Sequence, residues 1–162
     1  MEKSLTAVEV VGLAIAKERE AQDLYTRMSS EMKNPLVREK FLSLGREERR
    51  HEEILSGMYL KMTGEERSPK ISFSGKLSKA NFPGPNATFE DLLLFAIDRE
   101  KDSQRLYLEG VSVATDESGR RTFRYLADFE RGHEMILKTE LENYRRDKNW
   151  YAECPDIMLV GP

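Results

Sequence analysis

The sequence predicts an all-α protein, an antiparallel four-helix bundle with one long crossover between its second and third helices. Two observations lead to this prediction. Apolar residues recur at intervals of three and four positions in four separate segments, which is the period of an amphipathic helix. In addition, a pattern of glutamate and histidine residues lies within these apolar stripes and occurs twice, since Glu18 and Glu100 are 82 residues apart.

The first helix is expected over residues 6–32 and the second over residues 35–62. Thr6 and Glu9 form the Thr-x-x-Glu pattern of a capping box, in which each side chain binds the backbone N–H of the other residue. Asn34 is a favourable cap directly before a proline, and proline is tolerated at the first helical position. Because the turn between the two helices is short, they should form an antiparallel hairpin.

The third helix is expected over residues 89–114, and the fourth begins after Asp116 and continues to about Lys148. Between the two hairpins lies a crossover of 25 residues, 63–87, which contains glycine, proline and serine. An extended chain of this length spans up to roughly 80 Å, whereas a 27-residue helix is only about 40 Å long. The crossover can therefore return along the whole bundle, which gives the topology with one long connection.

An internal repeat relates residues 6–62 to residues 88–144 without any gap. Chance similarity of two amphipathic segments would match apolar positions, but this repeat also matches cap residues, tyrosines and the HEEIL and HEMIL stretches. We therefore expect one domain over residues 1–148, with the two halves related by a pseudo-two-fold axis. The tail, residues 149–162, is expected to cap the bundle or to contact a partner subunit.

Composition narrows the functional classes. The net charge is −3 although 34% of the residues are charged, and no basic block is present, so nucleic-acid binding is not expected. The single cysteine, Cys154, excludes an intramolecular disulfide and a Cys-x-x-Cys metal site, and it fits a reducing compartment. The apolar run over residues 10–16 is too short for a membrane span. A cytoplasmic protein with no membrane contact is the resulting expectation.

Each half contains one glutamate followed, on its next helix, by a Glu-x-x-His pair. A leucine would be expected at the glutamate positions, and a buried carboxylate without a partner is costly. Two divalent cations would balance four such carboxylates, and no Lys or Arg lies on the stripes nearby. Residues at i and i+3 share a helix face, so both can reach one ion. The predicted ligands of a two-metal site are Glu18, Glu48, His51, Glu100, Glu130 and His133.

Carboxylate and imidazole ligands together suit iron, with manganese or zinc as possible substitutes. Tyr25 and Tyr107 each lie two helical turns after a predicted ligand, and their hydroxyl groups are expected to bind ligand carboxylates from outside the metal sphere. Glu52 and Glu134 directly follow the histidines. They could act in the same way or could lie on the surface, and the sequence leaves both open.

The segments KEREAQDLY, REERRHEEIL, DREKDSQRLY and DFERGHEMIL carry a resemblance to the rubrerythrin-like branch of the ferritin-like di-iron superfamily. The resemblance covers roughly residues 6–148. It implies a ferritin-like bundle with a non-haem di-iron centre that reacts with hydrogen peroxide or dioxygen. There are two departures. The sequence lacks the four cysteines of a rubredoxin-like module. It also has Ser103 where classical rubrerythrins have an extra carboxylate, which predicts a more symmetric site.

The resulting hypothesis is a cytoplasmic di-iron oxidoreductase in peroxide or oxidative-stress defence, with no catalytic residue apart from the metal ligands. A separate electron-donor redox protein would re-reduce the two iron ions (Fe2+/Fe3+), and the chain would form a homodimer. Two alternatives remain at this stage. One is a ferroxidase or other iron-handling ferritin-like protein. The other is a non-redox binding bundle in which the metals hold the halves together.

Overall fold

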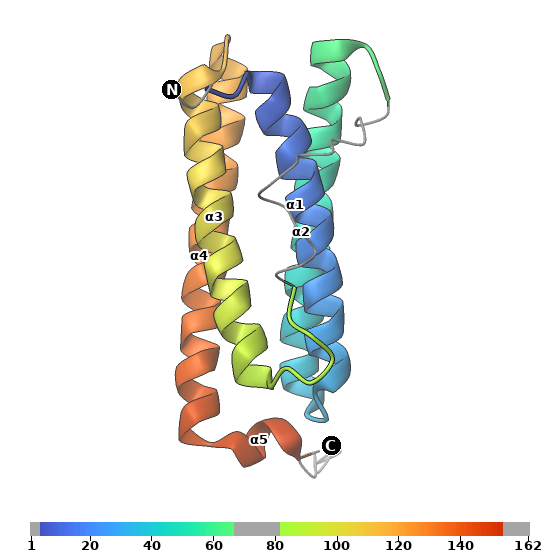
Figure 1. Ribbon diagram of the computed structural model, residues 1–162, viewed down its shortest axis with the longest axis vertical. Helices are drawn as coiled ribbons and strands as arrows, with labels where there is room; N and C mark the ends of the chain where they lie inside the picture. The colour runs from blue at the N-terminus through green and yellow to red at the C-terminus, as the bar shows by residue number, and fades with distance from the viewer. Residues whose placement is uncertain (1–3, 67–81, 154–162) are drawn as a thin grey trace, which may run out of the picture.

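The computed structural model describes residues 4–66 and 82–153, which form four long helices and one short one (Figure 1). The long helices are α1 (Ala7–Glu31), α2 (Pro35–Thr63), α3 (Phe89–Val113) and α4 (Glu117–Arg146), and the short helix is α5 (Lys148–Ala152). The predicted all-α four-helix bundle is confirmed. The ends of the long helices lie within two residues of the expected positions, because their caps are local signals.

Both hairpins begin with the same capping device. The backbone N–H of Thr6 donates to Glu9 at 2.7 Å, and that of Thr88 donates to Asp91 at 2.8 Å. In each box the threonine hydroxyl accepts a return bond from the backbone of the acidic residue. At the C-terminal end of the first hairpin, α2 stops at Gly64, whose φ of 73° is a left-handed conformation that glycine adopts without strain.

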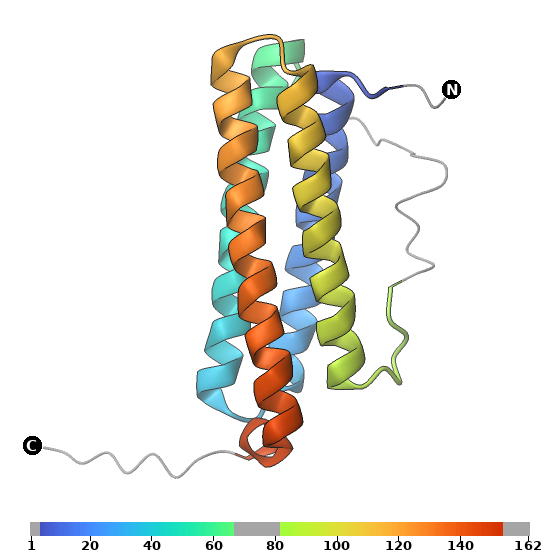
Figure 2. The same cartoon turned by 90° about the vertical axis from the view of Figure 1, so that its left-hand side faces the viewer.

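The helices are arranged as two hairpins, α1 with α2 and α3 with α4, joined mainly where α1 packs against α3. In contrast, α2 and α4 touch each other only sparsely. The end of α2 and the start of α3 lie at opposite ends of the bundle, as the predicted topology with one long connection requires (Figures 1 and 2). The sequence also predicts that apolar residues of the crossover anchor it to the bundle, namely Ile71, Phe73, Leu77 and Phe82. The first three lie outside the described residues, whereas Phe82 packs edge-on against Phe95 with ring centroids 5.5 Å apart.

Two apolar clusters fill the bundle, one toward each end. The first includes Leu24, Phe41, Leu92 and Leu137, and the second includes Ile15, Leu55, Leu106, Leu126 and other residues of the opposite helix ends. The glutamate and histidine positions lie between these clusters along every helix. Apolar side chains on both sides therefore separate this polar layer from the solvent at the bundle ends.

The described part of the tail forms α5, which folds across the lower end of the bundle in Figure 1. The hydroxyl of Tyr151 donates to Glu140 at 2.5 Å, and the side-chain amide of Asn34 donates to the carbonyl of Trp150 at 2.8 Å. Asn34 thus caps α2 with its oxygen and holds α5 with its nitrogen. Cys154 and the residues after it lie outside the described part of the chain.

Candidate metal centre

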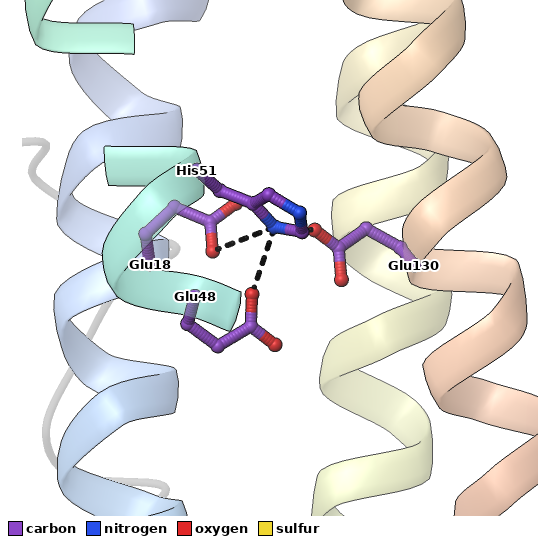
Figure 3. Close-up of side chains that lie close together, drawn as sticks. All are labelled: Glu18, Glu48, His51 and Glu130. Carbon is purple, nitrogen blue, oxygen red and sulfur yellow. Dashed lines mark hydrogen bonds and ion pairs between the residues drawn. The ribbon is translucent and has the colours of Figure 1, made fainter. Parts of the chain in front are cut away.

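All six predicted ligands converge in the middle of the bundle, each only 1–3% exposed. Every long helix contributes, with one glutamate each from α1 and α3 and one Glu-x-x-His pair each from α2 and α4. Figure 3 shows Glu18, Glu48 and His51 on one side, with Glu130 reaching toward them from α4. The arrangement follows from the sequence because each glutamate occupies a stripe that the apolar packing turns inward.

The six residues divide into two overlapping groups, each with ligand atoms within 4.8 Å of one another. The first group is Glu18, Glu48, His51 and Glu130, and the second is Glu48, Glu100, Glu130 and His133. Glu48 and Glu130 belong to both groups. This division is what two neighbouring ions require, with two shared carboxylates between them and one glutamate and one histidine at each end.

The two shared carboxylates each direct one oxygen toward each histidine. The Nδ1 atom of His51 lies 3.0 Å from Oε2 of Glu48 and 3.1 Å from Oε1 of Glu130. The Nδ1 atom of His133 lies 2.9 Å from Oε1 of Glu48 and 3.2 Å from Oε2 of Glu130. Both imidazoles therefore use the same nitrogen, and both carboxylates have the orientation of bridges.

Several of these buried atoms lie within ion-pair distance of one another but make no well-directed hydrogen bond among the described residues. They are Oε1 of Glu48, both carboxylate oxygens of Glu130 and Nδ1 of His133. Buried polar atoms are nearly always satisfied, so an unsatisfied group of this kind indicates a missing ligand or ion. The donor set of carboxylate oxygen and imidazole nitrogen also matches a first-row transition metal. The residues present therefore fit a pair of metal ions, although ligation by these particular residues stays a prediction.

The tyrosines bind across the two halves of the repeat. The hydroxyl of Tyr25 on α1 donates to Glu100 on α3, and the hydroxyl of Tyr107 on α3 donates to Glu18 on α1. Both rings are about 1% exposed. Each tyrosine thus fixes a terminal carboxylate of the opposite half, a pairing that sequence spacing alone could not identify.

The terminal and shared carboxylates have opposite pKa shifts. Burial, together with repulsion from Glu48 and Glu130, raises the pKa of both Glu18 and Glu100 well above its ordinary value. Burial also disfavours the ionised forms of Glu48 and Glu130, but interactions with the two histidines outweigh it, and the pKa of each is lowered. In the absence of metal, the terminal pair is therefore more easily protonated than the shared pair.

The histidines balance that charge. Burial alone would lower the pKa of His51, but the nearby carboxylates of Glu130, Glu18 and Glu48 raise that pKa to about 12. The pKa of His133 is raised for the same kind of reason, through Glu130 and Glu48. Two imidazolium groups then face two carboxylates, so the centre neutralises its own charge with protons. Two divalent ions would replace those protons.

Sequence reasoning missed Glu47, which binds the outer nitrogen of one histidine. Its Oε2 atom lies 2.6 Å from Nε2 of His133, and its side chain is 35% exposed. The corresponding place beside His51 is taken by Phe129, whose ring meets the imidazole edge-on with centroids 5.2 Å apart. A signal was available, because positions 47 and 129 correspond in the repeat and differ in residue type.

Glu52 and Glu134, which the sequence left undecided, join neighbouring helices. The side-chain amide of Gln22 donates to Glu52 at 2.7 Å, and that of Gln104 donates to Glu134 at 2.7 Å. The first bond links α1 to α2 and the second links α3 to α4. The repeat therefore preserves a pair of polar clamps beside the metal centre as well as the ligands.

Two basic residues lie close to the centre, although neither is on an apolar stripe. Lys17 and Arg99, each directly before a predicted ligand, line a cavity between α1 and α3 together with Ser103 and all four glutamates. Burial lowers the pKa of Lys17, and the guanidinium of Arg99 lies 3.1 Å from Glu20. Both side chains lie beside the apolar stripes, so helical periodicity assigned them to the solvent face.

A ferritin-like bundle with a buried layer of four carboxylates and two imidazoles defines the class of carboxylate-bridged di-metal proteins. The sequence profile of the Rubrerythrin family matches residues 9–141, and the chain accordingly belongs to the rubrerythrin family. None of the described helices has the length and apolar character needed to cross a membrane.

Two solved structures are similar over nearly the whole chain. A hypothetical protein from Pyrococcus furiosus has 28% identity and a TM-score of 0.71, and the match covers 92% of this chain and 94% of that one. A Thermotoga maritima protein, described as ferritin-like and diiron-carboxylate, has 24% identity and a TM-score of 0.65, covering 91% and 99%, and it supports the fold alone. No curated protein matches the chain.

Proposed function

We propose that this protein is a di-iron oxidoreductase of the cytoplasm that reduces hydrogen peroxide or dioxygen. The observation that carries the proposal is the placement of Glu48 and Glu130, each with one oxygen toward each histidine. Such bridges hold two ions close enough to act on one small oxidant. Membership of the rubrerythrin family supports iron over the manganese or zinc that the same donors also accept.

Each group of residues has a part in this function. Glu48 and Glu130 would bridge the two ions, while Glu18 with His51 and Glu100 with His133 would hold one ion each. When bound, two Fe(II) ions supply one electron each, which is the number needed to reduce peroxide to water. The tyrosine hydroxyl groups keep the terminal carboxylates in place, and the apolar clusters on both sides exclude bulk water.

The remaining parts of the proposal concern partners. A separate redox protein would return electrons to the centre after each turnover, because the sequence offers one cysteine and no second redox group. A homodimer is the proposed assembly.

The test is anaerobic loading of the full chain with Fe(II), followed by rapid mixing with peroxide or with dioxygen. We expect two iron ions per chain and a rise in ferric absorbance with at least one oxidant, faster than for aqueous Fe(II). A matched variant, Glu130→Ala, should lose this rise, whereas the exposed Glu39→Ala should retain it. If loaded wild-type protein reacts with neither oxidant, the oxidoreductase proposal fails and a structural role for the metals replaces it. Steady accumulation of iron far beyond two per chain would instead show iron storage.

A further inference from the structure

The two halves of the centre match at every predicted ligand but differ immediately outside it. The outer nitrogen of His133 lies 2.6 Å from the carboxylate of Glu47, whereas the ring of Phe129 packs edge-on against His51 with centroids 5.2 Å apart. These two outer residues occupy corresponding positions of the repeat. The asymmetry is therefore a difference between two otherwise equivalent sites in one chain.

This difference has a direct consequence for metal binding. An imidazole that binds a metal through Nδ1 carries its proton on Nε2 and can donate it outward. A carboxylate acceptor there fixes the tautomer and the ring orientation and makes the imidazole a stronger donor to the metal. The hydrogen bond is also charge-assisted, which makes it stronger than one between neutral groups. An aromatic ring offers no comparable acceptor beside His51.

The position of Glu47 suits this role. It lies on α2 and reaches His133 on α4, two helices that otherwise touch only sparsely. Glu47 and Phe129 both line an open groove between these helices, where their side chains are 35% and 36% exposed. Glu47 contacts His133, whereas Phe129 lies edge-on to both histidines and closer to His51, with ring centroids 5.2 Å apart against 6.4 Å for His133. Substitutions at either position leave the apolar core unchanged.

We propose that Glu47 is a positioning residue that makes the two metal positions unequal, so that the ion held by Glu100 and His133 binds more tightly and binds first. The inference rests on the di-metal centre of the proposed function and not on its redox reaction. Loss of oxidant reactivity would leave it standing, and equal metal positions would overturn it even in an active enzyme.

The test is titration of the metal-free full chain with Co(II), using chelator competition for affinity and ligand-field absorbance for coordination. Wild-type protein should bind two ions in two resolved steps. Glu47→Leu should weaken the tighter step by about 10–100-fold, the range for lost outer-sphere partners of metal ligands. Glu47→Gln keeps an acceptor oxygen and should recover part of the loss. Glu53→Leu, a similar change on the exposed face of α2, should alter neither step.

Combining Glu47→Leu with His51→Ala or with His133→Ala shows which of the two metal positions Glu47 affects. In His51→Ala protein the remaining strong position is that of His133, and Glu47→Leu should weaken it by the same factor. In His133→Ala protein, Glu47→Leu should change the affinity by less than about twofold. Coupling between contacting residues of this kind is what a double-mutant cycle isolates. Equal effects in the two backgrounds would show a general structural role and overturn the proposal.

The reciprocal variant adds a gain of function. Phe129→Glu places a carboxylate beside His51 and should strengthen the weaker step, whereas Phe129→Leu should not. Circular dichroism of the metal-free proteins checks that each variant folds, and the gain expected for Phe129→Glu cannot arise from misfolding. An unchanged weaker step in Phe129→Glu, together with an unchanged tighter step in Glu47→Leu, would overturn the proposal. Wild-type protein that binds fewer than two ions would overturn both this proposal and the di-metal centre.

Discussion

The two halves of the chain provide an internal comparison, because α1 with α2 and α3 with α4 place identical sets of predicted ligands in one layer. They share the capping boxes, the crossed tyrosines and the glutamine–glutamate clamps. They differ at Glu47 and Phe129, just outside the ligands. The comparison shows that the predicted ligands, and the tyrosines and glutamine–glutamate pairs that hold them in place, are the same in both halves. The residues behind one histidine are free to differ, and there the site acquires its asymmetry.

The halves also differ in how the helices pack around the tyrosines. Met28 is fully buried on α1, whereas the corresponding residue on α3 is Gly110. A Cβ atom on Gly110 would lie 2.8 Å from the ring of Phe123, so this ring occupies the space that a side chain would need. One half fills the position with a side chain on the first helix, and the other fills it with an aromatic ring from the second.

The largest expected effect tests whether the shared carboxylates are equivalent. In metal-free protein, Glu48→Leu or Glu130→Leu leaves two buried imidazolium groups with half of their counter-charge. Breaking a buried ion pair in this way costs about 3–5 kcal/mol. Urea unfolding of the metal-free variants should give this loss for both residues, within about 1 kcal/mol of each other. Glu18→Leu and Glu100→Leu should cost less, because those carboxyl groups are neutral without metal. A larger loss for Glu18→Leu than for Glu130→Leu would contradict the charge assignment.

Metal and proton binding should compete at the centre. The raised pKa values of His51, His133, Glu18 and Glu100 predict that all four groups hold a proton in the metal-free site, so loading two divalent ions should release about four protons per chain. Calorimetry in buffers of different ionisation enthalpy measures this number, and metal affinity should rise with pH. Saturation at a hundredfold excess over the dissociation constant should stabilise the fold by about 2.7 kcal/mol per site. Release of only about two protons would show that either the histidines or the terminal carboxyl groups hold no proton before loading.

The same pKa shifts fix the pH dependence of metal-free stability. The raised pKa of His51, about 12, stabilises the fold fully below the ordinary histidine pKa of 6.5, and this stabilisation is lost as the pH rises toward 12. Glu18 and Glu100 act in the same direction above the ordinary glutamate pKa of 4.5, because the folded state keeps their protons to higher pH. Unfolding free energies of metal-free protein should therefore fall from pH 6.5 to pH 9. In His51→Leu protein this fall should be smaller.

Packing around the tyrosines should respond differently in the two halves. Met28→Ala empties buried volume and should cost about 2–5 kcal/mol. Gly110→Ala drives a methyl group into the ring of Phe123 and should cost about 1–3 kcal/mol. Thermal unfolding of both variants checks the order. Gly57→Ala, on the same bundle but with open space around its Cβ position, is the matched control and should be neutral or slightly stabilising.

The smallest expected effect concerns the crossed hydrogen bonds. Tyr25→Phe and Tyr107→Phe each remove one hydroxyl from a terminal carboxylate, and each should cost about 1 kcal/mol in metal-free protein. Because the two bonds are related by the repeat, the losses should agree within about 0.5 kcal/mol, and chemical denaturation can resolve that difference. A clearly larger loss for one variant would extend the asymmetry of the histidines to the tyrosines.

Much of this protein could be predicted from the sequence by itself. The helix ends follow from caps such as Thr6 and Asn34, which act within one turn of chain. The topology follows from the lengths of the connections, and the convergence of the six glutamates and histidines follows from their place on apolar stripes. Each of these signals depends on residues close together in sequence or on a repeat that can be counted.

Only the tertiary structure decided which groups meet across helices. It identified Glu48 and Glu130 as the shared carboxylates, paired Tyr25 with Glu100, and placed Glu47 behind His133. These contacts depend on the distance between helices and on the rotation of each helix about its axis. Helical periodicity indicates which face of a helix points inward, but it does not determine which side chains meet across the bundle. The protonation of the centre depends in turn on those contacts. The sequence therefore determined which residues form the layer, and the packing of the four helices decided the role of each residue in it.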